Sequence, residues 1–124
     1  MSQRLRVLIA DDHTLFAEAL EAILDGDGRV RVVGRAGNGE EAVRLAADLD
    51  PDVVLMDISM PVMDGIEATA KLREQKPGTR VLILTGSDAA ADIDAARRAG
   101  AAGYVTKDRI AAELVQAILD AAGR

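Results

Sequence analysis

The stretch that decides the fold of this 124-residue chain is LMDISMPVMDG, residues 55–65. The apolar run VVLM, residues 53–56, ends in the carboxylate of Asp57, and Pro61 and Gly65 then predict a sharp bend. An apolar run without alternating polar residues is typical of a strand that is covered on both faces. A carboxylate at the end of such a strand therefore needs an explanation from the rest of the chain.

Four other apolar runs resemble the run at residues 52–56. They are short and mostly aliphatic, and they occupy residues 6–10, 30–34, 80–84 and 102–106. Stretches with helical spacing lie between and after these runs, for example Ile110, Leu114 and Ile118 in the last of them. Strands that alternate with helices predict a parallel sheet with helices on both sides, for which we expect the strand order 2-1-3-4-5.

Composition indicates one globular domain with an aliphatic core. The chain is 49% hydrophobic and 29% charged, and its length suits a single domain. Phe16 and Tyr104 are the only aromatic residues in the sequence, so aliphatic side chains, Met and Ala must fill the core. The sequence contains no cysteine, which excludes both disulfide bonds and thiolate chemistry.

Charge and hydropathy restrict the partners. The net charge is -6, so the domain by itself is a poor candidate for binding nucleic-acid backbones, although acidity also serves solubility. The N-terminal apolar run RLRVLIA is too short for a signal peptide or a membrane span. We therefore expect a cytoplasmic protein that does not enter a membrane.

Polar residues follow four of the five predicted strands. They are Asp11 and Asp12 after the first strand, Asp57 after the third, Thr85 after the fourth and Lys107 after the fifth. The carboxyl ends of parallel strands share one edge, and ligands bind there at the switch in strand order, so the three carboxylates should converge. Neighbouring carboxylates repel one another, and a lysine together with a divalent cation such as Mg²⁺ would relieve that repulsion.

Simpler interpretations exist for single residues. One Asp in such a position is more often a solvated loop residue or a helix cap, but three acids with a Thr and a Lys at four strand ends are not readily explained in that way. A lone loop histidine such as His13 is more often solvated than catalytic. Tyr104, taken alone, is better interpreted as a core aromatic at the last strand.

Four motifs, taken together, resemble the receiver domain of bacterial two-component response regulators. They are VLIADDH (7–13), VVLMDISMPVMDG (53–65), VLILTGS (81–87) and AGYVTKD (102–108). The first and last motifs resemble most the subfamily with a helix-turn-helix DNA-binding output domain. The resemblance covers essentially the whole chain and implies a flavodoxin-like (βα)5 three-layer sandwich over residues 1–124, with the output domain outside this chain.

The resemblance also implies a phosphoacceptor and a metal site. Asp57 would accept a phosphoryl group from a sensor histidine kinase. Asp12, Asp57 and the backbone carbonyl of Ser59 would bind Mg²⁺ or Mn²⁺ directly, with Asp11 assisting through water. The chemistry is plausible from the residues alone, because a carboxylate can act as a phosphoryl nucleophile and phosphoryl transfer needs mainly positioning and charge neutralisation.

The resemblance implies that three further residues would respond to the phosphoryl group. Lys107 would pair with the phosphoryl oxygens, Thr85 would hydrogen-bond to the phosphoryl group, and Tyr104 would move inward as the switch aromatic. The domain would be a regulator rather than an enzyme, and it would assist its own phosphorylation and dephosphorylation. Phosphorylation would alter a homodimer or an output-domain contact, and DNA would be bound only through the output domain to regulate transcription.

Several local features complete the sequence predictions. Asn38 with Glu41 predicts a capped helix start, and Asp108 and Ser87 are also candidate helix caps. Asp108 stands where the family often has proline, so a cis peptide bond is not expected there.

Small hydroxyl side chains at 59 and 87 predict a site open to water. The helix expected at residues 88–99 has Ile93 as its only large apolar residue, so we expect it to be loosely held.

Two other functions compete with the signalling switch. A Mg²⁺-dependent phosphohydrolase that forms an aspartyl phosphate usually needs a second acid two residues after the nucleophile, where Ser59 stands. A flavodoxin-like cofactor binder needs Ser, Thr or Gly after the first strand, whereas ADDH (10–13) would repel a phosphate. Both alternatives are therefore less well supported than the switch.

Overall fold

The computed structural model describes residues 4–86 and 90–123 and contains a five-stranded parallel sheet. The strand order is β2-β1-β3-β4-β5, as the sequence predicted. The strands are β1 (Leu5–Ala10), β2 (Val30–Ala36), β3 (Val53–Asp57), β4 (Arg80–Thr85) and β5 (Gly103–Thr106). Every adjacent pair is parallel, so all five carboxyl ends lie at one edge.

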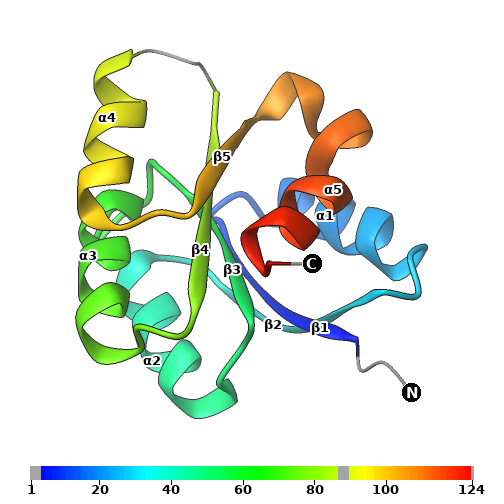
Figure 1. The fold of residues 1–124 in the computed structure, drawn as a ribbon, viewed down its shortest axis with the longest axis horizontal. Helices are drawn as coiled ribbons and strands as arrows, with labels where there is room; N and C mark the ends of the chain where they lie inside the picture. The colour runs from blue at the N-terminus through cyan, green and yellow to red at the C-terminus, as the bar shows by residue number, and fades with distance from the viewer. Residues whose placement is uncertain (1–3, 87–89, 124) are drawn as a thin grey trace.

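Helices cover both faces of this sheet and make the three-layer sandwich that was predicted (Figure 1). One face carries α1 (Thr14–Asp25) and α5 (Ile110–Ala121), and the other carries α2 (Gly39–Leu49), α3 (Gly65–Gln75) and α4 (Ala90–Ala99). A short 3-10 helix, η1 (Lys107–Arg109), joins β5 to α5. Within residues 4–86 and 90–123, no helix is long and apolar enough to cross a bilayer.

The buried core has two halves, one on each face of the sheet. On β1, Leu5, Val7 and Ile9 pack toward α1 and α5, whereas Leu8 and Ala10 pack toward α2 and α3. All five residues of β3 are buried. Apolar side chains are thus needed at successive positions, which is why these strands do not alternate apolar with polar residues.

The helix starts were only partly predicted. At α2, Asn38 Oδ1 accepts a hydrogen bond from the Glu41 N–H at 2.8 Å, and Glu41 Oε1 accepts one from the Gly37 N–H at 2.9 Å. Asp108 was wrongly predicted to cap the last helix, since it lies within η1 and α5 begins at Ile110 without a side-chain cap. A 3-10 turn bonds N–H groups locally at a helix start, so no capping side chain is required there.

Gly65 fixes the path of the chain directly after the third strand. A Cβ atom at this position would overlap the backbone carbonyl oxygen of Asp57. The N–H of Gly65 donates to the carbonyl oxygen of Ile58 at 3.0 Å, which closes the loop against the end of β3. Only glycine allows α3 to begin this close to the strand that ends in Asp57.

Candidate functional site

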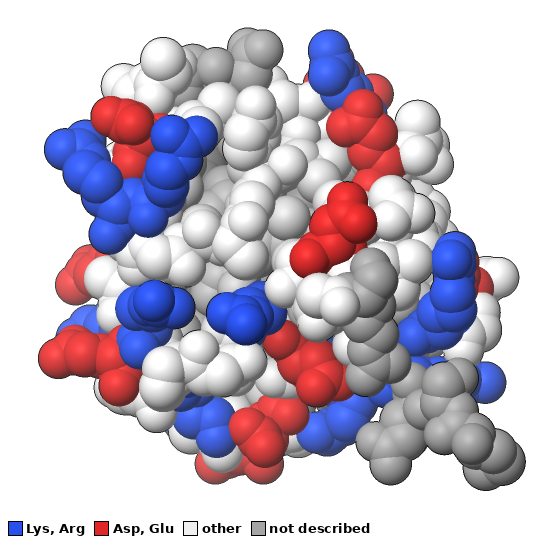
Figure 2. Space-filling model, in the orientation of Figure 1, with Lys and Arg blue, Asp and Glu red and all other residues white. Residues whose placement is uncertain are grey.

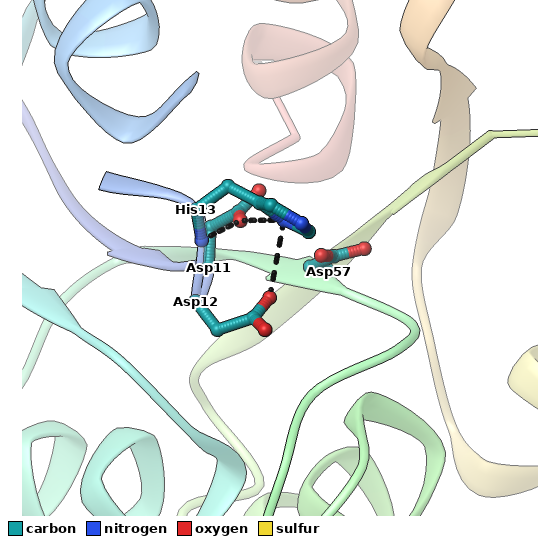
Figure 3. Close-up of side chains that lie close together, drawn as sticks. All are labelled: Asp11, Asp12, His13 and Asp57. Atoms are coloured by element: carbon teal, nitrogen blue, oxygen red, sulfur yellow. Dashed lines mark hydrogen bonds and ion pairs between the residues drawn. The ribbon is translucent and has the colours of Figure 1, made fainter. Parts of the chain in front are cut away.

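Three carboxylates from two neighbouring strands meet at the carboxyl edge of the sheet (Figure 3). Ala10 of β1 pairs with Met56 of β3, so the acids that follow these residues lie side by side. Asp11, Asp12, His13 and Asp57 each offer a ligand atom, and these atoms lie within 4.8 Å of one another. The strand order therefore brings together acids that are 45 residues apart in sequence (Asp12 to Asp57).

Burial sets the electrostatics of the central acid. Asp57 is 3% exposed, and this burial is the largest cause of a pKa raised above the usual value for Asp. The negative charge of Asp11 raises the pKa of Asp57 further, while Lys107 and the backbone N–H of Ser59, which bonds to the carboxylate, act in the opposite direction. Two buried acids with one lysine leave net negative charge at this edge.

Lys107 reaches the acids from η1, just beyond the end of β5. Its Nζ lies 3.5 Å from Asp57 Oδ1 and 3.8 Å from Asp11 Oδ2. The same ammonium lies 4.6 Å from the centre of the Phe16 ring, which contacts it from α1. The lysine is therefore held between two carboxylates and an aromatic face. The Lys107–Asp108 peptide bond is not cis.

One carboxylate oxygen of this cluster is left without a hydrogen bond. Asp11 Oδ2 is buried and has no hydrogen-bond partner in the part of the chain that the structure describes. Lys107, at 3.8 Å, offsets its charge but is too distant for a hydrogen bond. A hard divalent cation would satisfy such an oxygen, and carboxylates are the ligands that Mg²⁺ and Mn²⁺ prefer, so these residues fit the predicted metal.

His13 is the residue whose place sequence reasoning missed. Its side chain is 67% exposed, but its Nδ1 lies 3.2 Å from both Asp11 Oδ1 and Asp12 Oδ1 (Figure 3). Its backbone N–H also donates to Asp11 Oδ1 at 2.8 Å. The interpretation of His13 as a solvated loop residue agrees with this exposure, but it did not include the contacts of the ring with the two acids. The available signal was its position directly after two acids at a predicted sheet edge.

The remaining predicted residues lie around the acids at different depths. Thr85 is buried at the end of β4, one residue beyond the pairing of Asp57 with Leu84. Ser59 is exposed, two residues after Asp57. Ser87, predicted to be part of the site opening and a helix cap, lies outside the described residues.

Tyr104 points away from the core. Its side chain is 43% exposed, so the interpretation of Tyr104 as a core aromatic was wrong. It lines an open hollow of about 490 Å³ together with Gly86 and Thr106 at the carboxyl ends of β4 and β5. Because β5 is an edge strand, its outward side chains are only partly covered by neighbouring elements.

Comparison with known proteins agrees with this geometry. Residues 7–119 match the family model described as the response regulator receiver domain. The transcriptional regulatory protein NarL of Mycobacterium tuberculosis is 41% identical over 120 residues, which are 97% of this chain and 56% of that protein. The chain spans about half the length of the curated relatives it matches.

Solved structures are similar over nearly the whole chain. The signal receiver domain of NarL from M. tuberculosis has a TM-score of 0.94 and 40% sequence identity, with 98% of both chains covered. A chain of the CheX–CheY–BeF3–Mg²⁺ complex from Borrelia burgdorferi has a TM-score of 0.87 and 27% identity, covering 94% of this chain and 87% of that one. With this sheet order, this acidic edge and the family match, the chain belongs to the response regulator receiver domains, the phosphoacceptor modules of two-component signalling.

Proposed function

We propose that Asp57 is the phosphoacceptor of this receiver domain and that a sensor histidine kinase is the donor. One observation carries this assignment. Of the two buried acids in the cluster, Asp57 is the one nearer to the ammonium of Lys107, which lies 3.5 Å from its Oδ1, and it has further carboxylates beside it. A buried nucleophile flanked by a fixed positive charge is the arrangement that phosphoryl transfer needs.

In the proposed step, a carboxylate oxygen of Asp57 forms a bond to phosphorus. The bond between phosphorus and the imidazole nitrogen of the kinase phosphohistidine breaks, and its electron pair leaves with that nitrogen. Lys107 is close enough to Asp57 to pair with the phosphoryl oxygens as a point charge. Thr85, buried at the end of the adjacent strand, would hydrogen-bond to the phosphoryl group.

The cofactor proposed for this site is Mg²⁺ or Mn²⁺. Asp12, Asp57 and the backbone carbonyl of Ser59 would bind it directly, and Asp11 would assist through water. Support comes from Asp11 Oδ2, which has no hydrogen-bond partner in the described residues, and from the similarity to a chain of the CheX–CheY–BeF3–Mg²⁺ complex. When bound, the ion supplies charge neutralisation for the phosphoryl oxygens. The chain would in this sense assist its own phosphorylation and dephosphorylation, as a regulator rather than an enzyme.

The response to phosphorylation is proposed to run through Thr85 and Tyr104. Thr85 is buried beside the acids, whereas Tyr104 is partly exposed next to a hollow of about 490 Å³ that could receive its ring. Figure 2 shows mostly uncharged atoms over β5 in the middle of the view, with basic and acidic side chains to either side. A homodimer contact or an output-domain contact on this face would then change on phosphorylation.

The full-length protein is proposed to regulate transcription in the cytoplasm through a DNA-binding output domain outside these 124 residues. The relatives that the chain matches are about twice its length, and one is a transcriptional regulatory protein. The net charge of -6 makes it unfavourable for the receiver domain itself to contact the DNA backbone.

Intact-mass measurement after incubation with acetyl phosphate and Mg²⁺ tests the phosphoacceptor. We expect the wild-type chain to gain the mass of one phosphoryl group and Asp57→Asn to gain none. Asp94→Asn is a matched control, because Asp94 is an exposed acid on α4, away from the cluster. Peptide mapping that located the phosphoryl group on another residue would overturn the assignment. Multiple turnover of diverse phosphoesters would instead favour a phosphohydrolase, and flavin colour a cofactor binder.

A further inference from the structure

We propose that His13 is an additional ligand of the divalent cation at this site and shifts its preference from Mg²⁺ toward metals that accept imidazole nitrogen. Mn²⁺, Co²⁺ and Ni²⁺ form that class, with affinity rising in this order. This inference rests on the metal site of the proposed function and adds a residue that determines metal specificity.

The main support for this inference is the distance of the His13 Nδ1 atom from one oxygen of each neighbouring carboxylate. His13 Nδ1 lies 3.2 Å from Asp11 Oδ1 and 3.2 Å from Asp12 Oδ1. An octahedral ion with ligands near 2.1 Å places adjacent ligands about 3 Å apart. His13 Nδ1 and Asp12 Oδ1 therefore stand near the separation of neighbouring direct ligands, and Figure 3 shows the ring directed at both carboxylates.

A hydrogen bond from Nδ1 to Asp11 Oδ1 at 3.2 Å is one arrangement that fits this position of the ring, and a shared cation is the other. The backbone N–H of His13 already donates to Asp11 Oδ1 at 2.8 Å, so the ring approaches an oxygen that has a donor. A proton on Nδ1 could serve only one of the two carboxylates well. With the ring proton on Nε2 instead, the Nδ1 lone pair is available to a cation that Asp12 binds directly and Asp11 binds through water.

A second, independent observation indicates a cation at this place. The side chain of Asp11 is fully buried, and its Oδ2 has no hydrogen-bond partner within residues 4–86 and 90–123. Its other oxygen, Oδ1, is the atom that faces His13 Nδ1. One oxygen of the Asp11 carboxylate thus has the ammonium of Lys107 at 3.8 Å but no hydrogen-bond partner, while the other already stands beside the proposed nitrogen ligand.

The chemical consequence is selectivity. Mg²⁺ binds oxygen ligands and keeps several waters, so an imidazole nitrogen adds little to its affinity. Imidazole strengthens the binding of later first-row metals, for which affinity rises from Mn²⁺ to Ni²⁺. His13 should therefore change the ratio of affinities more than it changes the affinity for Mg²⁺.

Calorimetric titration of the wild-type chain and of His13→Ala with Mg²⁺, Mn²⁺ and Co²⁺ tests the selectivity. We expect His13→Ala to weaken Co²⁺ about tenfold or more, Mn²⁺ by less, and Mg²⁺ by about twofold at most. The variant should keep the start of α1, because the His13 side chain makes no helix-capping hydrogen bond. Asp11→Asn is the comparison variant and should weaken all three metals.

Electron spin echo spectroscopy of the Mn²⁺-loaded chain supplies a direct readout. His13 is the only histidine in the sequence, so nitrogen modulation typical of bound imidazole can come from no other residue. We expect this modulation in the wild-type chain and its loss in His13→Ala.

Absent modulation in the wild-type chain, or an equal loss of affinity for all three metals in His13→Ala, would overturn the role of His13 and leave the carboxylate site intact. Failure of the wild-type chain to bind any of the three metals would overturn the metal site itself. The two failures are therefore distinguishable.

Discussion

The middle strand and the edge strand of the sheet are held very differently. All five residues of β3 are buried, whereas β5 buries Val105 and leaves Tyr104 43% exposed. The flanking helices differ in the same way, since the buried residues of α4 are limited to Ala96 while α5 buries Ile110, Leu114, Ile118 and Leu119. Asp57 thus lies at the end of a strand that is covered on both faces, which we call the fixed part of the molecule. Tyr104, the proposed switch residue, lies on the α4–β5 side, which is less completely buried.

The largest effect is expected from a change that disturbs the fixed part. Gly65→Ala would place a Cβ atom against the backbone carbonyl of Asp57, and neither backbone can move without displacing β3 or α3. We expect the free energy of unfolding, measured by urea denaturation, to fall by about 3 kcal/mol or more.

Gly28→Ala is the matched control for this change. A Cβ atom at Gly28 meets nothing within 4 Å in the described residues, so the same substitution should be nearly neutral there. Equal stability of Gly65→Ala and Gly28→Ala would show that the end of β3 is not as constrained as its burial indicates.

A smaller effect is expected from the contrast between the two helices that flank the edge strand. Backbone amides of α4 should exchange with solvent through local opening, with an opening free energy about 1–3 kcal/mol below that of α5 amides. The reason is that the buried residue of α4 is the small Ala96, while Ile93 is only partly buried and lines a hollow. Hydrogen exchange followed by NMR measures both helices in one sample, so α5 serves as the internal control.

Ile93→Ala sharpens the comparison between these helices. Removing this side chain should speed exchange in α4 while exchange in α5 changes little. Protection of α4 equal to that of α5 in the wild-type chain would contradict the view that the α4–β5 side is loosely held.

The pH dependence of the free energy of unfolding tests whether the buried, ionised carboxylate of Asp57 destabilises the folded protein. Burial raises the folded-state pKa of Asp57 above 3.8, the ordinary value that applies to the unfolded chain. At pH values between the unfolded-state pKa and the folded-state pKa, the folded protein therefore holds more protons than the unfolded chain. Stability from this group therefore falls as pH rises through that window. Asp57→Asn should have the higher free energy of unfolding near neutral pH with a chelator present, and the difference should disappear below the ordinary Asp pKa.

Asp48→Asn is the control for that measurement, since Asp48 is an exposed acid on α2. Its stability should follow the wild-type pH dependence. An Asp57→Asn variant that was less stable than the wild-type chain near neutral pH would mean that the pairing with Lys107 outweighs the cost of burial.

Sequence reasoning was sufficient for the sheet and for which residues reach its edge. Apolar runs without alternation predict strands covered on both faces, and the strand order then brings Asp11 and Asp57 together. The direction of the His13 ring was not predictable, because it depends on the backbone angles of a loop residue (φ -94°, ψ 99°). Neither was the exposure of Tyr104, since sequence pattern does not show how completely α4 and α5 cover an edge strand.

The smallest expected effect concerns the contact that links the lysine of the site to the first helix. Phe16 packs against the core on the α1 and α5 side, and Lys107 Nζ lies 4.6 Å from its ring centre. A double-mutant cycle of Phe16→Leu and Lys107→Met, read from the free energy of unfolding, should give a coupling of about 0.5–1 kcal/mol. Leucine keeps most of the apolar contact, so the coupling isolates the attraction between the ammonium and the ring. A coupling of zero would mean that Asp11 and Asp57 alone position Lys107, and that the fixed part of the site ends at the sheet.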